Sequence, residues 1–236
     1  MKRAQYLTIA AFLLAACSEP ANQEADAGSA PVIDTPAIDD GEVNLDVWLE
    51  RLEVGSRELY SAREAVVAAA GLNEGDVVAD IGAGTGLYTL LFAEAVGAKG
   101  HVYSVDIEPL FLDLINRRAE DMGFYNITAV LGRRNDISLP EQSVDVVFIA
   151  DTYHYFENRE DIMRTVRNAL KPGGSLIIVD YEITSETVRP DDKSHVRFGK
   201  AGVISEMEYV GFETSDDVSV DGLSENYFVR FRKSNP

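Results

Sequence analysis

The sequence has little cysteine and few basic residues, and each shortage excludes a class of protein. A single cysteine among 236 residues rules out an internal disulfide framework and a cysteine-rich zinc site, and we expect no metal. Lys and Arg number 21 against 40 Asp and Glu, which gives a formal charge of -19. Because nucleic-acid phosphates reward clustered basic side chains, we expect no nucleic-acid partner.

The sequence also lacks a hydrophobic run long enough for a transmembrane helix. The apolar run near its start covers residues 6–16, whereas a membrane-spanning helix needs about 20 residues. Lys2 and Arg3 precede this run, which is typical of a secretory signal peptide. The run leads into the letters LAAC, which resemble the lipobox of bacterial lipoproteins. The resemblance implies a signal peptide over 1–17 and lipidation of Cys17; an uncleaved N-terminal helix is the alternative.

Basic side chains are absent from residues 18–44. The stretch 18–46 holds eight acids and three prolines, and such a composition cannot bury enough apolar surface to offset its ordering entropy. We therefore expect a flexible acidic linker over 18–44 and one folded domain over 45–236. A serine directly after the cysteine, as Ser18 is here, resembles the pattern of lipoproteins that are sorted to the outer membrane. This resemblance implies a lipid-anchored protein of the bacterial cell envelope, on the periplasmic face of the outer membrane.

From residue 45 onward, helical patterns alternate with short apolar runs. Helical spacing covers 45–70, with further helical patterns near 87–97, 109–122, 158–170 and 194–210. The apolar runs predict strands at 77–81, 101–106, 127–131, 144–150 and 175–182. Runs that are apolar throughout are typical of parallel strands covered on both faces. Two last runs, 212–220 and 225–232, have no helix between them and predict a hairpin. The pattern predicts a doubly wound α/β fold with a mostly parallel, seven-stranded sheet and a C-terminal antiparallel hairpin.

The strongest local signal is a glycine-rich turn after the first predicted strand. It contains Gly82, Gly84 and Gly86, and glycine lets the backbone turn tightly and come close to a ligand. A nicotinamide or flavin fingerprint needs glycine where Leu87 stands. Asp80, two residues before the turn, would repel a pyrophosphate, so a ligand with an ammonium group at this end fits better. A plain strand-to-helix turn without a ligand is the alternative.

A second acidic residue closes the next predicted strand. Asp106 stands 24 residues after Gly82, at a strand tip where a carboxylate can accept hydrogen bonds from both hydroxyls of a ribose and would reject a 2′-phosphate. By itself, an aspartate at a strand end is equally well explained as a solvated cap. Together with the glycine turn, Asp106 predicts a nucleoside-binding site.

These residues carry a resemblance to a known family. The patterns D-x-G-x-G-x-G, V-D-I-E, D-I-x-L-P and L-K-P-G-G follow one another over residues 71–180, and they resemble the small-molecule branch of the class I S-adenosylmethionine-dependent methyltransferases. The resemblance implies a Rossmann-like sheet and S-adenosyl-L-methionine as the cofactor. It implies that the turn holds the methionine moiety, through Asp80, Gly82, Ala83, Gly84 and Gly86.

The same resemblance implies contacts for the rest of the nucleoside. It places Asp106 on the ribose and Ile107 against the adenine. It also places an acid on the adenine amino group, which in the stretch LGRRNDISLP is Asp136, with Ile137 beside it. A simple loop acid is the alternative for Asp136.

The candidates for catalysis follow the fourth predicted strand, at the edge where open α/β sheets bind ligands. Asp151, Tyr153 and His154 form a D-x-Y-H pattern, which resembles a subset of the same family with poorly defined substrates. His154 is a candidate general base, and a histidine packed among aromatic side chains is the alternative. Tyr153 and Asp151 are candidates for lining the sulfonium pocket. The pattern departs from the N/D-P-P-Y motif of nucleic-acid-directed members, so the acceptor implied is a small molecule or a lipid.

Three more residues are weaker candidates. Glu53 and Arg57 lie on the N-terminal helix that caps the cofactor in this family, although a solvated helix pair four residues apart explains them as well. His195 lies in the segment that forms a substrate lid in many members.

Methyl transfer is the leading hypothesis, and two others stay open. A protein of the cell envelope would lie apart from the cytoplasmic supply of the cofactor, which leaves room for a catalytically silent sensor that binds an adenosyl ligand. An NAD-dependent oxidoreductase is disfavoured by Leu87 and Asp80. The methyl acceptor and the oligomeric state cannot be read from the sequence.

Overall fold

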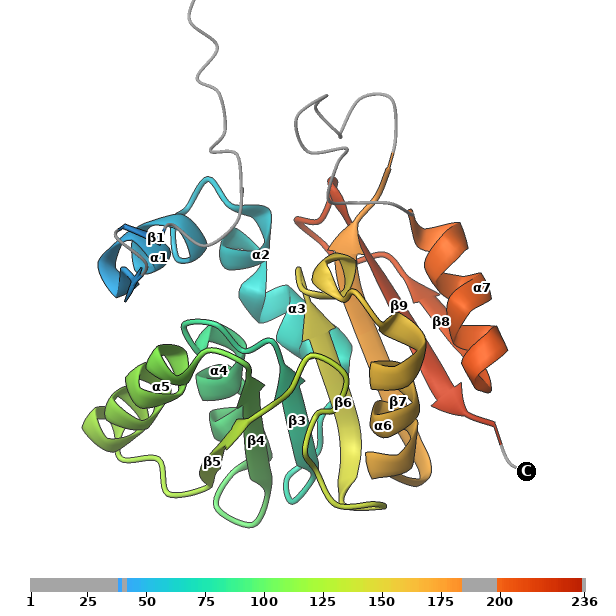
Figure 1. Ribbon diagram of the computed structural model, residues 1–236, viewed down its shortest axis with the longest axis horizontal. Helices are drawn as coiled ribbons and strands as arrows, with labels where there is room; N and C mark the ends of the chain where they lie inside the picture. Colours follow the sequence, from blue (N-terminus) through green and yellow to red (C-terminus); the bar gives the residue numbers. More distant parts are fainter. Residues whose placement is uncertain (1–37, 40–41, 184–198, 235–236) are drawn as a thin grey trace, which may run out of the picture. The chain divides into compact units, whose positions relative to one another are not determined.

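The computed structural model describes residues 38–39, 42–183 and 199–234, and a sheet of seven strands lies at its centre (Figure 1). The order across the sheet is β5-β4-β3-β6-β7-β9-β8. The bounds are β3 Val77–Ile81, β4 His101–Asp106, β5 Ile127–Leu131, β6 Val144–Ala150, β7 Leu170–Tyr181, β8 Phe212–Val218 and β9 Asn226–Lys233. The first five are parallel, while β9 runs antiparallel to β7 and β8. The predicted fold class, including the C-terminal hairpin, is confirmed.

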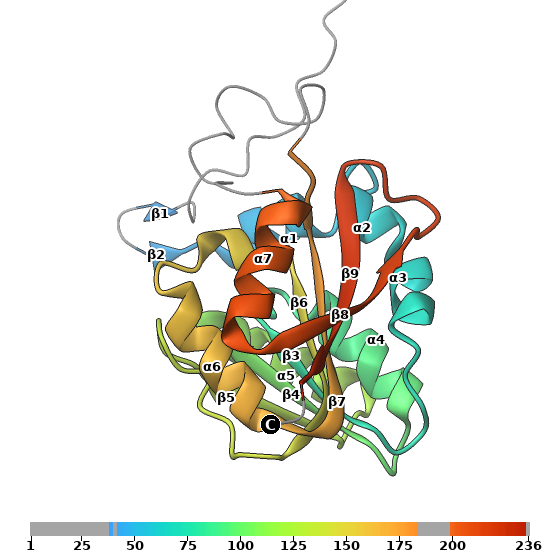
Figure 2. The same cartoon turned by 90° about the vertical axis from the view of Figure 1, so that its right-hand side faces the viewer.

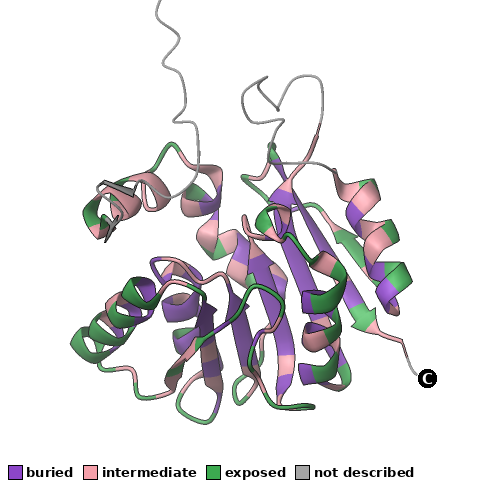
Figure 3. Ribbon diagram, viewed as in Figure 1, coloured by how far each residue is buried: buried purple, intermediate pink, exposed green. Residues whose placement is uncertain are grey.

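The apolar runs form strands because both faces of the sheet are covered. On β6, Val146 and Phe148 join one core while Val147 and Ile149 join the other, as the alternation of side chains along a strand requires. The helices that cover one face are α3 Arg63–Ala70 and α4 Leu87–Val96, and those on the other are α6 Arg159–Ala169 and α7 Lys200–Val210 (Figure 2). Helix α5, Pro109–Met122, packs on β4 and β5. Burial is therefore concentrated along the strands (Figure 3).

The helical stretch predicted over 45–70 consists of three helices instead of one. They are α1 Leu45–Leu52, α2 Glu58–Ser61 and α3 Arg63–Ala70. The first ends at its C-cap Glu53, and Arg57 is the N-cap of α2. Gly55 is exposed in the connection, where glycine's conformational freedom favours a loop over a helix. Glu53 and Arg57 therefore do not share a helical turn.

Other predicted boundaries move by a few residues. Strand β7 begins at Leu170, five residues before the predicted start. Leu170 pairs with Val144, and the register shifts between Val144 and Val146. Strand β8 ends at Val218, two residues early, and α7 begins at Lys200. Residues 184–198, which include the candidate His195, lie outside the described part of the chain.

The N-terminal predictions fall mostly outside the described residues, which include neither the signal peptide over 1–17 nor Cys17. Within the predicted linker, β1 Ile38–Asp39 and β2 Glu42–Val43 pair antiparallel. Helix α1 begins where the folded domain is predicted to begin, and the Asn44 side chain accepts hydrogen bonds from the first amides of that helix. In the part of the chain that the structure describes, no helix is long and apolar enough to cross a membrane.

The carboxyl ends of the parallel strands meet at one edge of the sheet. From β3, the chain proceeds to β4 and β5 on one side and then returns to place β6 on the other. This reversal is a topological switch point, where open α/β sheets bind ligands. The residues that leave the edge beside it are those of the glycine turn after β3 and of the segment after β6.

Candidate functional site

The glycine turn leaves β3 at the switch point and leads into α4. Gly82, Gly84 and Gly86 have φ angles of 70°, 54° and 84°, a left-handed conformation that side chains disfavour. A Cβ at Gly82 would lie 2.2 Å from the side chain of Thr152, and one at Gly86 would lie 2.6 Å from Ile115. Protein packing thus requires two of the three glycines, and Gly84 is left with the least crowded backbone.

Asp80 supports the turn from behind. Its side chain is buried, and Oδ2 accepts a hydrogen bond from the Thr89 hydroxyl of α4 at 2.6 Å. Burial raises the pKa of Asp80 to about 7, against the hydrogen bond from Thr89, and the charge of Asp106 adds to the rise. The side chain of Asp80 thus links its own strand, β3, to α4. Its direct contact with a ligand stays a prediction.

Asp106 ties the end of β4 to the turn. Its Oδ2 accepts the N–H of Gly84 at 2.9 Å, and its Oδ1 accepts the N–H of Glu108 at 2.9 Å. Ala83 follows the same path, because its N–H donates to the carbonyl of Val105. Burial raises the pKa of Asp106, while the N–H donors of Glu108 and Gly84 oppose the shift. Each carboxylate oxygen can accept more than one hydrogen bond, so capacity for ribose hydroxyls remains.

The residues predicted to contact adenine differ in burial. Ile107 is 56% exposed, and Leu131, at the end of the neighbouring strand, is 55% exposed, so an apolar surface lies open at this end of the edge. Asp136 is half-buried. Ile137, by contrast, is fully buried in the core, and its N–H donates to the Thr165 hydroxyl of α6. The side chain of Ile137 therefore packs inside the protein and does not face the edge.

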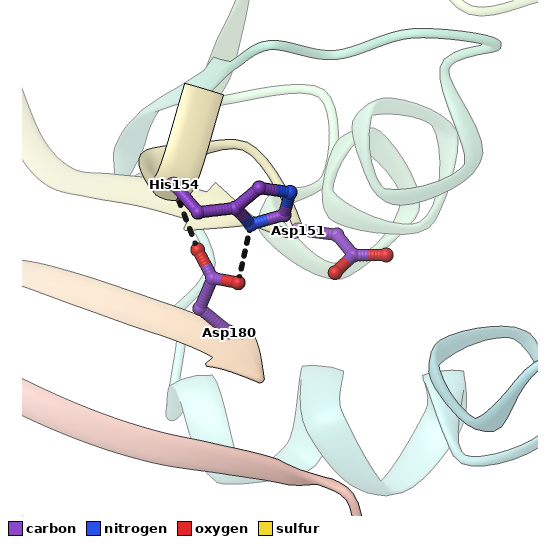
Figure 4. Close-up of side chains that lie close together, drawn as sticks. All are labelled: Asp151, His154 and Asp180. Carbon is purple, nitrogen blue, oxygen red and sulfur yellow. Dashed lines mark hydrogen bonds and ion pairs between the residues drawn. The ribbon is translucent and has the colours of Figure 1, made fainter. Parts of the chain in front are cut away.

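The segment after β6 forms the other half of the site. It contains the 3-10 helix η1, Tyr153–Tyr155. Nδ1 of His154 lies 2.6 Å from Oδ1 of Asp180 on β7, and the backbone N–H of His154 donates to Oδ2 at 3.2 Å (Figure 4). With its Nδ1–H donated to the carboxylate, the neutral ring presents its lone pair at Nε2. Figure 4 shows Nε2 on the side of the ring away from Asp180.

The environment of His154 favours a base held in one orientation. Burial by itself would lower the pKa of His154, but the charge of Asp180 and the hydrogen bond with it raise that pKa above its ordinary value, and Asp151 adds to the rise. The rings of Tyr155 and Tyr181 flank the imidazole at centroid distances of 4.1 and 5.9 Å. The histidine does lie among aromatic side chains, as the alternative predicted. Packing alone, however, would neither orient the ring nor raise its pKa, and the buried carboxylate of Asp180 does both.

Asp151 is strained and paired with the N-terminal segment. Its φ of 52° is left-handed, a conformation that costs a non-glycine residue about 1–3 kcal/mol and clusters at functional sites. Its Oδ2 lies 2.7 Å from Nη2 of Arg57. Glu53 instead pairs with Arg118 of α5, which also donates to the carbonyl of Thr85 in the glycine turn. The connection between α1 and α2 is thus bound to both halves of the site, and the alternative of a solvated Glu53–Arg57 pair is wrong.

Tyr153 lies in the core instead of at the predicted sulfonium pocket. It is 2% exposed, and its hydroxyl donates to Glu206 of α7, which also pairs with Arg159 of α6. Burial and this hydrogen bond raise the pKa of Tyr153. The side chain therefore holds η1 against the helices that cover this face.

Asp151, His154 and Asp180 also lie close enough to be considered as metal ligands, since their candidate ligand atoms fall within 4.8 Å of one another. Arg57 already balances the charge of Asp151. Both oxygens of Asp180 accept N–H groups, from His154 and Tyr181. A cation would have to displace these partners, so the charge balance favours a histidine–carboxylate pair over a metal centre.

The sheet order, the glycine turn and the strand-tip aspartate together define a Rossmann-like methyltransferase fold. A crystal structure titled as a SAM dependent methyltransferase from Aquifex aeolicus has this fold, with a TM-score of 0.70 and 24% identity, and the match covers 81% of this chain and 100% of that one. Residues 72–216 match the family model described as a methyltransferase domain. The chain belongs to this family.

Curated proteins of similar sequence include ubiquinone/menaquinone biosynthesis C-methyltransferases. The protein from Ectopseudomonas mendocina is 33% identical over 137 residues, which cover 58% of this chain and 53% of that protein. The protein from Azotobacter vinelandii is 31% identical over 144 residues, which cover 61% and 56%. The chain spans about half the length of the curated relatives it matches.

The cofactor of this family is S-adenosyl-L-methionine, and the residues present fit it. Gly84 is the least crowded glycine of the turn, Asp106 has acceptor capacity to spare, and Ile107 offers an exposed apolar surface. Asp151 Oδ1 and Arg57 Nε are buried without a hydrogen-bond partner among the described residues, which is typical of a site that a polar ligand completes.

Asp180, the partner of His154, was not predicted from the sequence. The signal was present, because Asp180 lies near the carboxyl end of a predicted strand, the same position that drew attention to Asp106. An acidic residue at the carboxyl end of any of the parallel strands is a candidate for the site, because open α/β sheets bind ligands at this edge.

Proposed function

We propose that this chain is an S-adenosyl-L-methionine-dependent methyltransferase that acts on a small molecule or a lipid. The observation that carries the proposal is the His154–Asp180 pair, which holds a base of raised pKa at the same sheet edge as the glycine turn and Asp106. A fold by itself hosts many functions. A base beside a nucleoside site supports a transfer reaction in which the acceptor loses a proton.

When bound, the cofactor supplies a methyl group on a positively charged sulfur for in-line attack by the acceptor. The chain contributes chiefly by positioning, because an aligned attack geometry is worth about 7–11 kcal/mol. A general base adds about 10²–10⁴-fold. Asp106 and the turn hold the nucleoside, and Nε2 of His154 accepts the proton of the acceptor. Asp180 stabilises the imidazolium that results.

Two observations support the acceptor class. The named relatives are C-methyltransferases of ubiquinone and menaquinone biosynthesis, which favours an acceptor carbon on a small molecule or a lipid. Tyr155, 41% exposed beside His154, offers an aromatic surface on which an apolar ring can pack. The strongly acidic chain remains a poor partner for nucleic acid.

Isothermal titration and methyl labelling of the full-length protein test the proposal. We expect binding of S-adenosylhomocysteine, and transfer of radiolabelled methyl from the cofactor to a component of a lipid or small-molecule extract. The His154→Ala variant is expected to bind the nucleoside and to lose most of the transfer. Tight binding without transfer by the wild type would favour the sensor, and absence of binding would reject both functions.

We also propose that the protein is anchored in the bacterial cell envelope through Cys17. The basic start, the short apolar run and the acidic stretch after the cysteine support this. We expect palmitate to label the wild type, and the Cys17→Ser variant to be unlabelled and to leave the membrane fraction. A wild type that carries no label, or a serine variant that fractionates as the wild type does, would contradict the anchor.

A further inference from the structure

Arg57 and Asp151 form an ion pair in which each partner keeps one unbonded polar atom. Nη2 of Arg57 lies 2.7 Å from Oδ2 of Asp151, and the two side chains are 14% and 7% exposed. Nε of Arg57 and Oδ1 of Asp151 are buried and have no hydrogen-bond partner among the described residues. A buried donor and a buried acceptor left unpaired are costly, so their presence in one ion pair favours a ligand that pairs with both.

Residues that adjoin or bind this ion pair contact the glycine turn. Thr152, the residue after the carboxylate, packs on Gly82, with its hydroxyl oxygen 3.4 Å from the Gly82 carbonyl oxygen. On the other partner, Nη1 of the arginine donates to the carbonyl of Leu52 at 3.2 Å. The side chain of Leu52 is in turn the nearest neighbour of the position that a Cβ at Gly84 would occupy. Each partner of the ion pair is thus one residue removed from a contact with the turn, which favours this end of the site for a ligand of the unbonded atoms.

We propose that Arg57 and Asp151 bind the α-amino acid head of the cofactor. Oδ1 of Asp151 accepts a hydrogen bond from the ammonium group, and Nε–H of Arg57 donates to the carboxylate. The four charged groups then alternate in sign, so each contact is attractive and charge-assisted. A simple anion would leave Asp151 unpaired and a simple cation would leave Arg57 unpaired, whereas a zwitterion satisfies both.

The backbone of Asp151 and the other charged groups near the turn favour the same assignment. The left-handed φ of Asp151 is a strained conformation that persists where function needs it. Arg118, another cation near the turn, already pairs with both carboxylate oxygens of Glu53 and donates to the carbonyl of Thr85. Asp80 is bonded to α4 behind the turn. The assignment rests on the proposed function, because it presupposes an adenosyl cofactor.

Two nucleosides that differ in the amino acid head test the assignment. S-adenosylhomocysteine carries the head, and 5′-methylthioadenosine lacks it. In titrations of the full-length protein, Arg57→Met and Asp151→Asn are each expected to weaken the affinity for S-adenosylhomocysteine by roughly tenfold or more, because each removes one charge-assisted hydrogen bond. Both variants are expected to bind methylthioadenosine as the wild type does. Arg63→Met is the control, because Arg63 pairs with the exposed Glu64, and we expect it to change neither affinity.

The pattern of losses decides the matter. Equal weakening of both nucleosides by the two variants would overturn the assignment, since the ion pair would then support the crevice as a whole. Unchanged binding of S-adenosylhomocysteine would also overturn it. A wild type that binds neither nucleoside would overturn the proposed function together with the assignment. If the wild type binds both nucleosides, either of the two results above overturns the assignment alone and leaves the proposed function standing. The asparagine variant keeps the test available if the methionine variant fails to fold.

Discussion

Replacing Asp180 with asparagine is expected to slow methyl transfer at neutral pH by about 10²–10⁴-fold, the range that a general base contributes. Asp180 accepts the Nδ1–H of His154 at 2.6 Å. Asparagine offers one carbonyl oxygen and an N–H in place of two acceptor oxygens, so it no longer enforces that tautomer. With the proton on Nε2, His154 accepts none from the acceptor. Asp180 therefore acts as a positioning residue, and a radiolabelled methyl-transfer assay measures its effect.

The pH profile separates this role from a structural one. In the wild type, the neutral imidazole is the base, so the rate rises with pH through the raised pKa of His154. Burial opposes that rise in pKa, and Asp180 causes it. Without the carboxylate, the pKa of His154 is expected to fall, so the rate rises at lower pH than in the wild type while its plateau is reduced. Damage to the fold alone would reduce the plateau without moving the midpoint.

Asp145→Asn is the matched control for this prediction. Asp145 lies on β6, accepts the N–H of Val77 at 2.9 Å and pairs with Lys171 at 2.7 Å. It thus has a backbone donor and a basic partner, as Asp180 does, yet it contacts none of the site residues. We expect its rate and pH midpoint to match those of the wild type. An Asp180→Asn enzyme with the wild-type rate and midpoint would show that His154 is not the base.

The fold could be predicted because its signals are local and repeated. Strands such as β6 are apolar throughout because both faces are covered, and the lack of a helix between β8 and β9 indicates a hairpin. The helical stretch over 45–70 was predicted too simply, because apolar spacing continues across a break at Gly55. Helical periodicity reports which side chains face a core, and it does not report whether the backbone between them is continuous.

The site residues that lie in short motifs could be predicted, whereas their partners from distant segments could not. The glycine turn and Asp106 come from short motifs whose geometry is set by the strand ends that carry them. The pairs His154–Asp180 and Arg57–Asp151 join residues 26 and 94 positions apart, and no local pattern specifies such partners. Tyr153 lies next to His154 in η1 but is directed into the core. The sequence could not show this, because side-chain directions in so short an irregular segment follow no regular period.

Replacing Asp106 with alanine is expected to weaken the binding of S-adenosylhomocysteine at least about tenfold, because on the proposed function it removes hydrogen bonds to the ribose that are each worth about 1.5–3 kcal/mol. The structure adds a second cost. Asp106 also accepts the N–H groups of Gly84 and Glu108, and the alanine leaves both without their acceptor, which loosens the glycine turn. Isothermal titration of the full-length protein measures the combined loss.

Two further variants separate the ribose contact from the support of the turn. Asp106→Asn keeps one acceptor oxygen and replaces the other with an NH2 group that donates, so it accepts fewer hydrogen bonds from the two backbone N–H groups and the ribose. We therefore expect it to bind less tightly than the wild type and more tightly than the alanine variant. Glu108→Ala removes a neighbouring carboxylate whose Oε1 accepts the N–H of Leu110 at the start of α5, and we expect it to leave the affinity unchanged. If Asp106→Ala binds the nucleoside as tightly as Glu108→Ala does, the ribose is held by another residue of this sheet edge.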